Sequence, residues 1–156
     1  MTKPEGEKVV ARNRKAYHEF HVLEDVEAGL VLTGPEVKSL RLGQIALGDA
    51  YARFIQGELY LVNAHIPEYK MRGYAEQEPL RPRKLLLHRR ELARISTRIE
   101  EKGLTVVPLA VYFKRGYAKV KLGVCRGKKL HDKREAIARR DAARAATREA
   151  RHDKMK

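Results

Sequence analysis

The segment LTVVPLAVYFKRGYAKVKLGV, residues 104–124, contains two strand-like apolar runs joined by a Lys-Arg-Gly turn. In its second half Val120, Leu122 and Val124 alternate with Lys119 and Lys121. This two-residue period is typical of a strand with one buried face. Two such runs on either side of a short glycine-containing turn predict an antiparallel hairpin. The fold is therefore expected to be built from hairpins.

Two earlier segments have the same pattern. Residues 49–66, DAYARFIQGELYLVNAHI, predict a strand, a Gln56-Gly57 turn and a second strand. Residues 17–34 contain the runs YHEFHVL and EAGLVLTG, and Ala28-Gly29 is the expected bend of another hairpin. The first 12 residues are mostly polar, and we expect them to be flexible.

The segments between the hairpins carry helix signals. In residues 34–43, GPEVKSLRLG, Pro35 suits the first helical position and Gly43 suits the stop. Residues 85–103 predict the clearest helix. Leu92, Ile95 and Ile99 form its apolar stripe, and Gly103 ends it. His88 stands at its N-cap position, where it is a poor cap, with Glu91 three residues on.

Six strands in three hairpins predict a mainly β fold. A small open sheet would leave free edges, which closure into a barrel removes. We therefore expect a closed six-stranded antiparallel barrel of the oligonucleotide-binding type over residues 13–126, with about three short helices. A basic C-terminal tail, residues 127–156, would follow it and would be disordered in the free protein.

Charge is concentrated in this tail. The 156-residue chain has a formal net charge of +14, and residues 126–156 contain 12 basic and 5 acidic side chains. This asymmetry indicates a polyanionic partner, and nucleic acid is the first candidate. A membrane is not expected, because no long apolar run accompanies the charge. A solvated tail that only raises non-specific affinity stays an alternative.

No motif in the sequence points to catalysis. Nucleotide-binding loops and serine-nucleophile motifs are absent, and the single Cys125 excludes an internal disulfide. Zinc is not expected, nor is any cofactor. Asp49, Glu58 and Glu68 have no spacing that favours a nuclease site over solvated carboxylates. The N-terminus has no signal-peptide region, which predicts a cytoplasmic protein.

Several tyrosines lie beside basic residues and offer base-stacking surfaces. Tyr69 and Tyr74 belong to the proline-containing segment 67–84, where stacking and a structural role are both open. Tyr112 and Tyr117 flank the Lys-Arg-Gly turn, and for these two we expect packing in the core.

Five blocks of the sequence together resemble the small protein B (SmpB) family, the protein partner of bacterial transfer-messenger RNA (tmRNA). They are NRKAYHEF (13–20), EAGLVLTGPEVKSLRLG (27–43), RKLLLH (83–88), KGLTVVPLAVYF (102–113) and GKKLHDKR (127–134). The resemblance spans residues 13–135. Beyond Arg134 it extends only to a basic composition rich in Ala, Arg and Glu.

The resemblance implies a non-enzymatic protein of trans-translation. Such proteins bind the tRNA-like domain of tmRNA and deliver it, with elongation factor Tu and alanyl-tmRNA, to ribosomes stalled on mRNA lacking a stop codon. They mimic an anticodon arm, and the tail becomes helical in the empty mRNA channel, so that the nascent chain is tagged for degradation and the ribosome is released. Ribosomal RNA of the 30S and 50S subunits in the stalled ribosome is a further partner. A monomer is expected. The alternatives are a constitutive ribosomal protein and an oligonucleotide-binding-fold nuclease or RNA-modifying enzyme.

The same resemblance implies two sets of site residues. One set would contact the tRNA-like domain, and its members are Asn13, Lys15, Glu27, Lys38, Ser39, Arg41, Arg83, Lys84, Leu86, His88 and Lys119. The other set would act in the ribosomal decoding centre and mRNA channel, and its members are Gly127, Lys128, Lys129, His131, Asp132, Lys133 and Arg134. Two positions depart from the family pattern: His88 stands where many members have Asn, and Pro35 where Thr or Trp is frequent.

Overall fold

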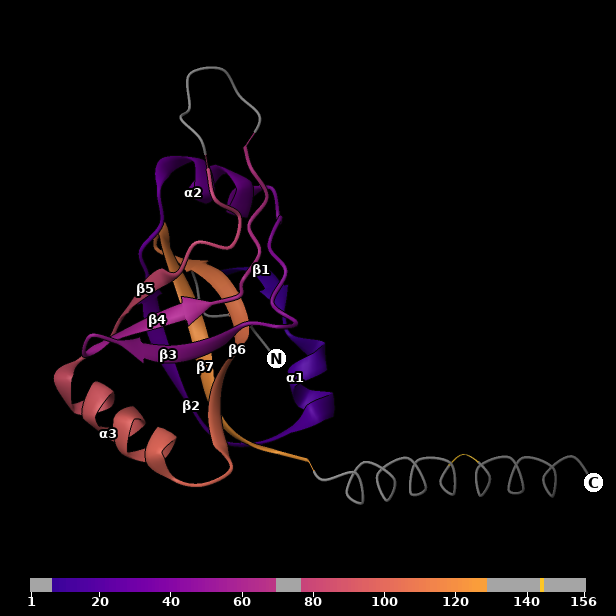
Figure 1. Ribbon diagram of the computed structural model, residues 1–156. Coiled ribbons are helices and arrows are strands. Elements are labelled where there is room, and N and C mark those ends of the chain that lie inside the picture. The colour runs from indigo at the N-terminus through magenta and orange to yellow at the C-terminus, as the bar shows by residue number, and fades with distance from the viewer. Residues whose placement is uncertain (1–6, 70–76, 129–143, 145–156) are drawn as a thin grey trace, which may run out of the picture.

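A computed structural model describes residues 7–69, 77–128 and 144 of the chain. It contains one antiparallel sheet of seven strands and three helices (Figure 1). In chain order these are β1 (Glu7–Arg12), α1 (Arg14–Glu19), β2 (Phe20–Leu30), α2 (Gly34–Arg41), β3 (Tyr51–Ile55), β4 (Glu58–Val62), β5 (Arg83–Leu86), α3 (Arg89–Glu100), β6 (Leu104–Lys114) and β7 (Tyr117–Gly127).

The strands follow the order β1-β6-β7-β2-β5-β4-β3, so β1 and β3 are the two edges. The sheet is strongly curved, and β3 packs against β6 (Figure 1). The prediction of a mainly β, antiparallel fold is confirmed. The strand count of six is wrong, and hydrogen-bonded pairing within the described residues leaves β1 and β3 unjoined, so the sheet is not closed.

The N-terminal part differs most from the predicted pattern. Residues 7–12, for which the sequence gives no strong strand signal, form strand β1 and pair with β6. The predicted first hairpin is instead helix α1 followed by the single long strand β2. The strand continues through Ala28 and Gly29, because β2 pairs with β7 along its length and with β5 at its end.

Both other hairpins are confirmed. The β3–β4 turn has positive φ at Gln56 and Gly57, and the β6–β7 turn has positive φ at Arg115 and Gly116. Two successive residues with φ > 0 are typical of tight hairpin turns whose twist matches the strands.

Helix α2 has the predicted limits, with Pro35 in its first turn and φ of +77° at Gly43. Helix α3 begins directly after His88, the predicted N-cap residue, and residues 83–86 before it form strand β5. Its stripe is confirmed: Ile95 is buried, and Leu92 and Ile99 pack against the core. No helix in the described part of the chain is long and apolar enough to cross a membrane.

Candidate nucleic-acid interface

An open pocket of about 460 Å³ lies where β2, β5, β7 and the start of α3 meet. It brings together four of the residues predicted to contact RNA: Glu27, Leu86, His88 and Lys119. Its other lining residues are Gly29, Leu87 and Glu91. Positions that are far apart in the sequence thus form one site.

Strand pairing explains this convergence. Gly29 on β2 is opposite Lys119 of β7 on one side and opposite Leu86 of β5 on the other. A Cβ atom at position 29 would lie 3.2 Å from Leu86 Cβ, which is a tight contact. Glycine therefore lets β5 approach β2 closely, and Glu27 points outward two residues earlier on the same face.

The carboxylate of Glu27 is held by its neighbours on β6. The Tyr112 hydroxyl donates to Glu27 Oε1 at 2.5 Å, and Lys114 Nζ lies 3.5 Å from the same atom. The hydrogen bond from Tyr112, aided by the charges of Lys114 and Lys119, lowers the pKa of Glu27, and partial burial only partly opposes this. Oε2 has no hydrogen-bond partner among the described residues. The pocket therefore presents an ionised acceptor, suited to base or ribose donors.

The opposite wall combines apolar and basic groups. Leu86, the last residue of β5, is 53% exposed. His88, Arg89 and Arg90 lie at the start of α3, where both arginines are exposed and His88 lines the pocket. The His88 backbone N–H donates to Glu91 Oε1 at 3.2 Å, which fixes the first turn of the helix beside the pocket. These groups suit contact with a base and its phosphates.

A second basic group lies on α2. Lys38 Nζ is 5.5 Å from the ring centroid of Tyr69, and the Arg41 guanidinium is 4.9 Å from that of Phe113. The aromatic rings orient both basic side chains by cation–π contact. For Tyr69, this gives the aromatic ring a defined partner within the fold.

Three residues predicted to contact RNA have buried side chains that are hydrogen-bonded within the fold. Asn13 caps α1 by accepting from the Ala16 N–H, and its amide donates to the carbonyls of Leu47 and Pro108. The Ser39 hydroxyl donates to the Pro67 carbonyl at 2.9 Å. Arg83 is completely buried in an ion pair with Glu36. The polar groups of these residues are already bonded inside the protein, so their positions argue against direct contact with RNA.

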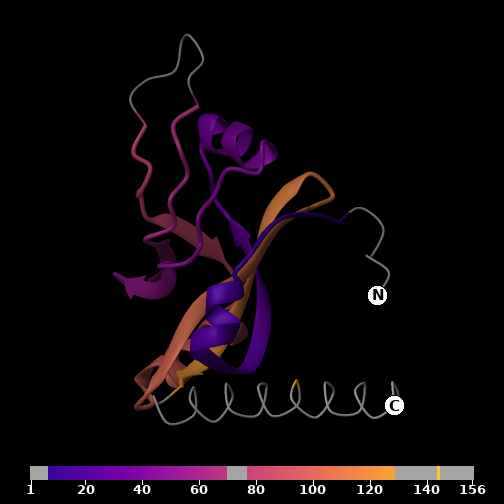
Figure 2. The same ribbon diagram turned by 90° about the vertical axis from the view of Figure 1, so that its right-hand side faces the viewer.

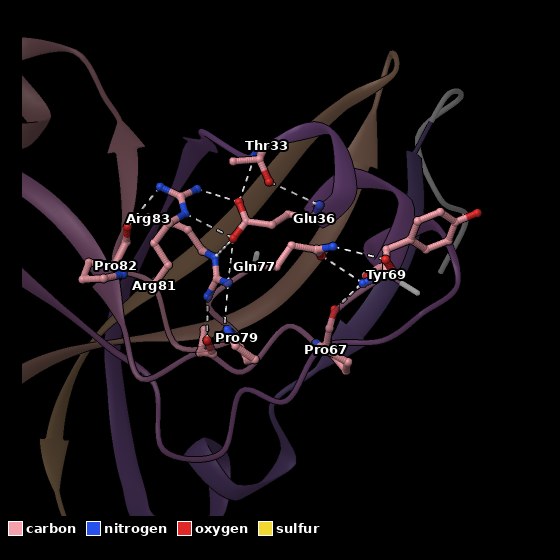
Figure 3. Close-up of polar contacts among 11 residues, drawn as sticks. Thr33, Glu36, Pro67, Tyr69, Gln77, Pro79, Arg81, Pro82 and Arg83 are labelled. Atoms are coloured by element: carbon pink, nitrogen blue, oxygen red, sulfur yellow. Dashed lines mark hydrogen bonds and ion pairs between the residues drawn. The ribbon is translucent and has the colours of Figure 1, made fainter. Parts of the chain in front are cut away.

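The cluster around Glu36 is a feature that the sequence reasoning missed (Figure 3). Arg83 Nε and Arg81 Nη2 donate to the two carboxylate oxygens at 2.7 and 2.5 Å. Burial raises the pKa of Glu36, but hydrogen bonds from Arg81, the Thr33 backbone and Arg83 outweigh it and leave the pKa lowered. The available signal was the capping-box spacing of Thr33 and Glu36, which the structure contains.

The same cluster fixes the long segment between β4 and β5. Arg83 also donates to the carbonyls of Ala64 and Pro79, at 2.7 and 3.0 Å. Gln77 forms two hydrogen bonds with the backbone of Tyr69, at 2.9 and 3.1 Å (Figure 3). The described parts of this segment are therefore tied to α2, next to Lys38.

Two further predicted residues are exposed and form surface ion pairs. Lys15 Nζ lies 3.1 Å from Asp49 Oδ1, and Lys84 Nζ lies 3.1 Å from Glu58 Oε1. Each carboxylate considered for a nuclease site at positions 49 and 58 thus has a lysine partner. Surface pairs of this kind contribute little to stability and exchange easily for phosphate contacts.

Cys125 is fully buried, and burial raises the pKa of its thiol to about 11. A thiol in that state is a poor nucleophile. The residue therefore belongs to the packing of the sheet against α1.

The structure describes only the start of the tail. Gly127 is the last residue of β7. Lys128 follows it, donating from its backbone N–H to the Glu19 carbonyl at 2.9 Å and from Nζ to the Tyr17 carbonyl at 3.3 Å. The other predicted tail residues lie outside the described residues, and they are Lys129, His131, Asp132, Lys133 and Arg134.

Known proteins resemble this chain over nearly its whole length. The family model "SmpB protein" matches residues 10–152. The SsrA-binding protein of Carboxydothermus hydrogenoformans is 56% identical over 138 residues, covering 88% of this chain and 93% of the relative. That of Chloroflexus aurantiacus is 54% identical over 156 residues, covering 97% and 98%.

A solved structure gives the same result. A chain from "tmRNA-SmpB: a journey to the center of the bacterial ribosome" has a TM-score of 0.67 and 51% sequence identity, covering 81% of this chain and 93% of its own length. The family model, the curated relatives and the solved structure agree: this chain belongs to the SmpB protein family.

Proposed function

We propose that this chain binds the tRNA-like domain of tmRNA, also called SsrA RNA, and acts with it in trans-translation on stalled ribosomes. Two groups of findings support this. The relatives are named SsrA-binding proteins, and the structural neighbour is described with tmRNA and the bacterial ribosome. The observation that carries the proposal is the pocket that joins Glu27, Leu86, His88 and Lys119 on one face of the sheet.

The pocket has the chemistry of an RNA contact. An ionised carboxylate repels phosphate, so Glu27 would accept hydrogen bonds from an exocyclic amine, a ring N–H or a 2′-hydroxyl. Lys119 and the exposed arginines at the start of α3 would neutralise the phosphates on either side. Lys15, Lys38, Arg41 and Lys84 would extend this contact by charge alone.

The curved sheet supports a finer view of the fold. Its two halves are brought together where β3 packs against β6, as in a partly open barrel of the oligonucleotide-binding type. In this proposal residues 13–126 form the RNA-binding unit, to which β1 adds one edge strand. The protein would act as a monomer without catalytic chemistry.

The tail would act on the ribosome. Lys128 is anchored at the end of α1, which fixes the point where the tail begins. We propose that Gly127 to Arg134 lie near the decoding centre, with Lys133 and Arg134 against phosphates of ribosomal RNA and the rest of the tail in the empty mRNA channel. Elongation factor Tu would deliver the complex with alanyl-tmRNA.

The test is selective binding. The full-length protein is titrated with an RNA that contains the tRNA-like domain, at two salt concentrations, with ordinary tRNA as competitor. We expect tight binding that ordinary tRNA displaces poorly, and a loss of about 1–3 kcal/mol with Glu27→Ala. Asp25→Ala is the matched control, since it removes a carboxylate from the same face of β2, where Asp25 pairs with Lys121 at 3.7 Å outside the pocket.

Unselective binding with a steep salt dependence would contradict the proposal and favour a generic polycation. Retention on ribosomes washed in high salt, in amounts equal to the ribosomal subunits, would instead support a constitutive ribosomal protein. RNA cleavage or modification that one carboxylate substitution abolishes without loss of binding would support an enzyme.

A further inference from the structure

Tyr117 is an unusually exposed aromatic residue at the tip of the β6–β7 hairpin. Its exposed fraction is 72%, the highest among the exposed large hydrophobic residues of the described chain. The predicted core packing is confirmed for Tyr112, which is 9% exposed, and is wrong for Tyr117. A ring in this position buries little area within the fold, so its stacking faces are available to a partner.

The tip lies on the same face of the sheet as the pocket. Tyr117 and Lys119 alternate with the buried Val120 along β7, so both side chains point away from the core. Lys119 lines the pocket, and two residues along a strand span about 6.6–6.8 Å. An extended RNA strand that places one nucleotide at the pocket therefore brings its neighbour to Tyr117.

Basic residues are neighbours of Tyr117 in the hairpin. Lys114 is opposite Tyr117 in the hairpin, and the exposed Arg115 occupies the turn between them. The turn projects from the body of the protein beside α2 (Figure 2), where Arg41 stacks on Phe113. An aromatic ring within a group of lysine and arginine side chains matches a nucleotide in both charge and shape.

Arg115 is the first of the two turn residues with positive φ, at +52°, a conformation that Gly, Asn and Asp adopt most readily. Gln56 has the same conformation in the β3–β4 turn, with a φ of +50°, so this conformation belongs to the tight turn itself. The long side chain adds a positive charge next to Tyr117 without contributing to the core.

We propose that Tyr117 stacks on an unpaired base of the RNA bound at the pocket. That base belongs to the nucleotide next to the one whose donors reach Glu27, and Lys119 and Arg115 neutralise the phosphates on either side of it. The inference rests on the proposed function, because it takes the RNA to be the tRNA-like domain of tmRNA.

The absence of tryptophan from the 156 residues allows a direct test. In full-length Tyr117→Trp, the new indole is the sole tryptophan and keeps an aromatic surface at the tip. On titration with tRNA-like-domain RNA, we expect its fluorescence to be quenched as the indole stacks, with an affinity close to that of the unmodified protein. Tyr17→Trp is the matched control, because Tyr17 is 54% exposed on α1, away from the β6–β7 turn (Figure 2).

Affinities of further variants complete the test. Tyr117→Ala should weaken binding about 5- to 150-fold, the range measured for a lost base–aromatic stack, whereas Tyr117→Phe should bind like the unmodified protein. Arg115→Asn keeps a residue suited to positive φ and should lower the slope of log K against log salt by about one phosphate contact.

The outcomes separate the two proposals. The unmodified protein could bind RNA selectively while Tyr117→Ala keeps its affinity and the fluorescence of Tyr117→Trp stays unchanged on titration. That result would overturn the stacking role and leave the proposed function standing. Absence of selective binding by the unmodified protein overturns both. If circular dichroism shows that Tyr117→Ala does not fold, the fluorescence of Tyr117→Trp is compared with that of Tyr17→Trp. Equal fluorescence changes of the two variants on titration with RNA would overturn the stacking role.

Discussion

The Arg83 guanidinium donates from Nε to Glu36 Oε2 over 2.7 Å, with Arg83 fully buried and Glu36 only 5% exposed. The pair joins β5 to the first turn of α2. The remaining donors of Arg83 reach backbone carbonyls in the segment between β4 and β5, so both charged groups are compensated. This arrangement fixes α2, and with it Lys38 and Arg41, against the sheet.

Replacing Arg83 with Met should lower the free energy of unfolding by about 3–5 kcal/mol, because it leaves a buried carboxylate with less compensation. The remaining bond from Arg81 favours the lower end of this range. Urea denaturation monitored by circular dichroism measures the change. Arg81→Met is the matched control and should cost less, since the Arg81 side chain is 37% exposed. Equal losses for the two variants would contradict the importance of the buried pair.

The same carboxylate predicts a dependence of stability on pH. The pKa of Glu36 is lower in the folded protein than in the unfolded chain, where a glutamate has a pKa of about 4.3. Its contribution is therefore present above pH ~4.3 and is lost as the pH falls through the folded pKa. Melting temperatures between pH 7 and pH 3 should decline toward acid more steeply for the unmodified protein than for Glu36→Gln. Parallel curves would show that other carboxylates cause the acid sensitivity.

The local patterns of this sequence predicted much of the fold. The hairpins at 51–62 and 104–127 follow from alternation and turn residues, and α2 from its proline and glycine. The errors lie where pairing partners are distant. Strand β1 has only six residues, three of them charged, and its pairing with β6 makes it a strand. An edge strand of this kind has no strong local signal.

The sequence predicted which residues belong to the candidate site, but it did not predict how they are arranged in space. Family blocks identified Glu27, Leu86 and His88, but only the strand order β7-β2-β5 brings them together. Block matching could not separate residues on the open face of the site from residues that support the fold. Asn13 and Arg83 belong to matched blocks, yet both are buried and bonded internally.

Tyr112→Phe should weaken binding to the tRNA-like domain by about 0.5–1.5 kcal/mol, because the hydroxyl orients Glu27 at 2.5 Å and lowers its pKa. Without that hydrogen bond the carboxylate takes up a proton at higher pH, so the variant should lose affinity earlier on acidification. Binding measured at several pH values between 7 and 4, which span the ordinary pKa of a glutamate, tests both effects.

Tyr60→Phe is the matched control for this change. Tyr60 donates to Glu58 at 3.1 Å, a similar pair on the exposed surface of β4, outside the pocket. The control should bind RNA normally. In a double-mutant cycle, Tyr112→Phe should have little further effect in the Glu27→Ala background. Additive losses would mean that Tyr112 acts on RNA independently of Glu27.

We expect substitutions in the tail to reduce activity on the ribosome without reducing affinity for the tRNA-like domain. Replacing Lys133 and Arg134 with Ala removes two charges from the segment proposed for the decoding centre and leaves the described sheet and its pocket unchanged. Affinity for the tRNA-like domain should therefore stay close to that of the unmodified protein, while tagging of chains on stalled ribosomes in a reconstituted translation system should be lost.

A second double substitution tests whether the position of the charges in the tail matters or only their number. Arg148→Ala with Arg151→Ala removes the same charge from the far end of the tail, outside the five sequence blocks. If Lys133 and Arg134 contact defined phosphates, their loss should reduce tagging far more than loss of the distal pair. Equal reductions would mean that the tail acts through its total charge, because a non-specific electrostatic contribution depends on the number of cations and not on their place.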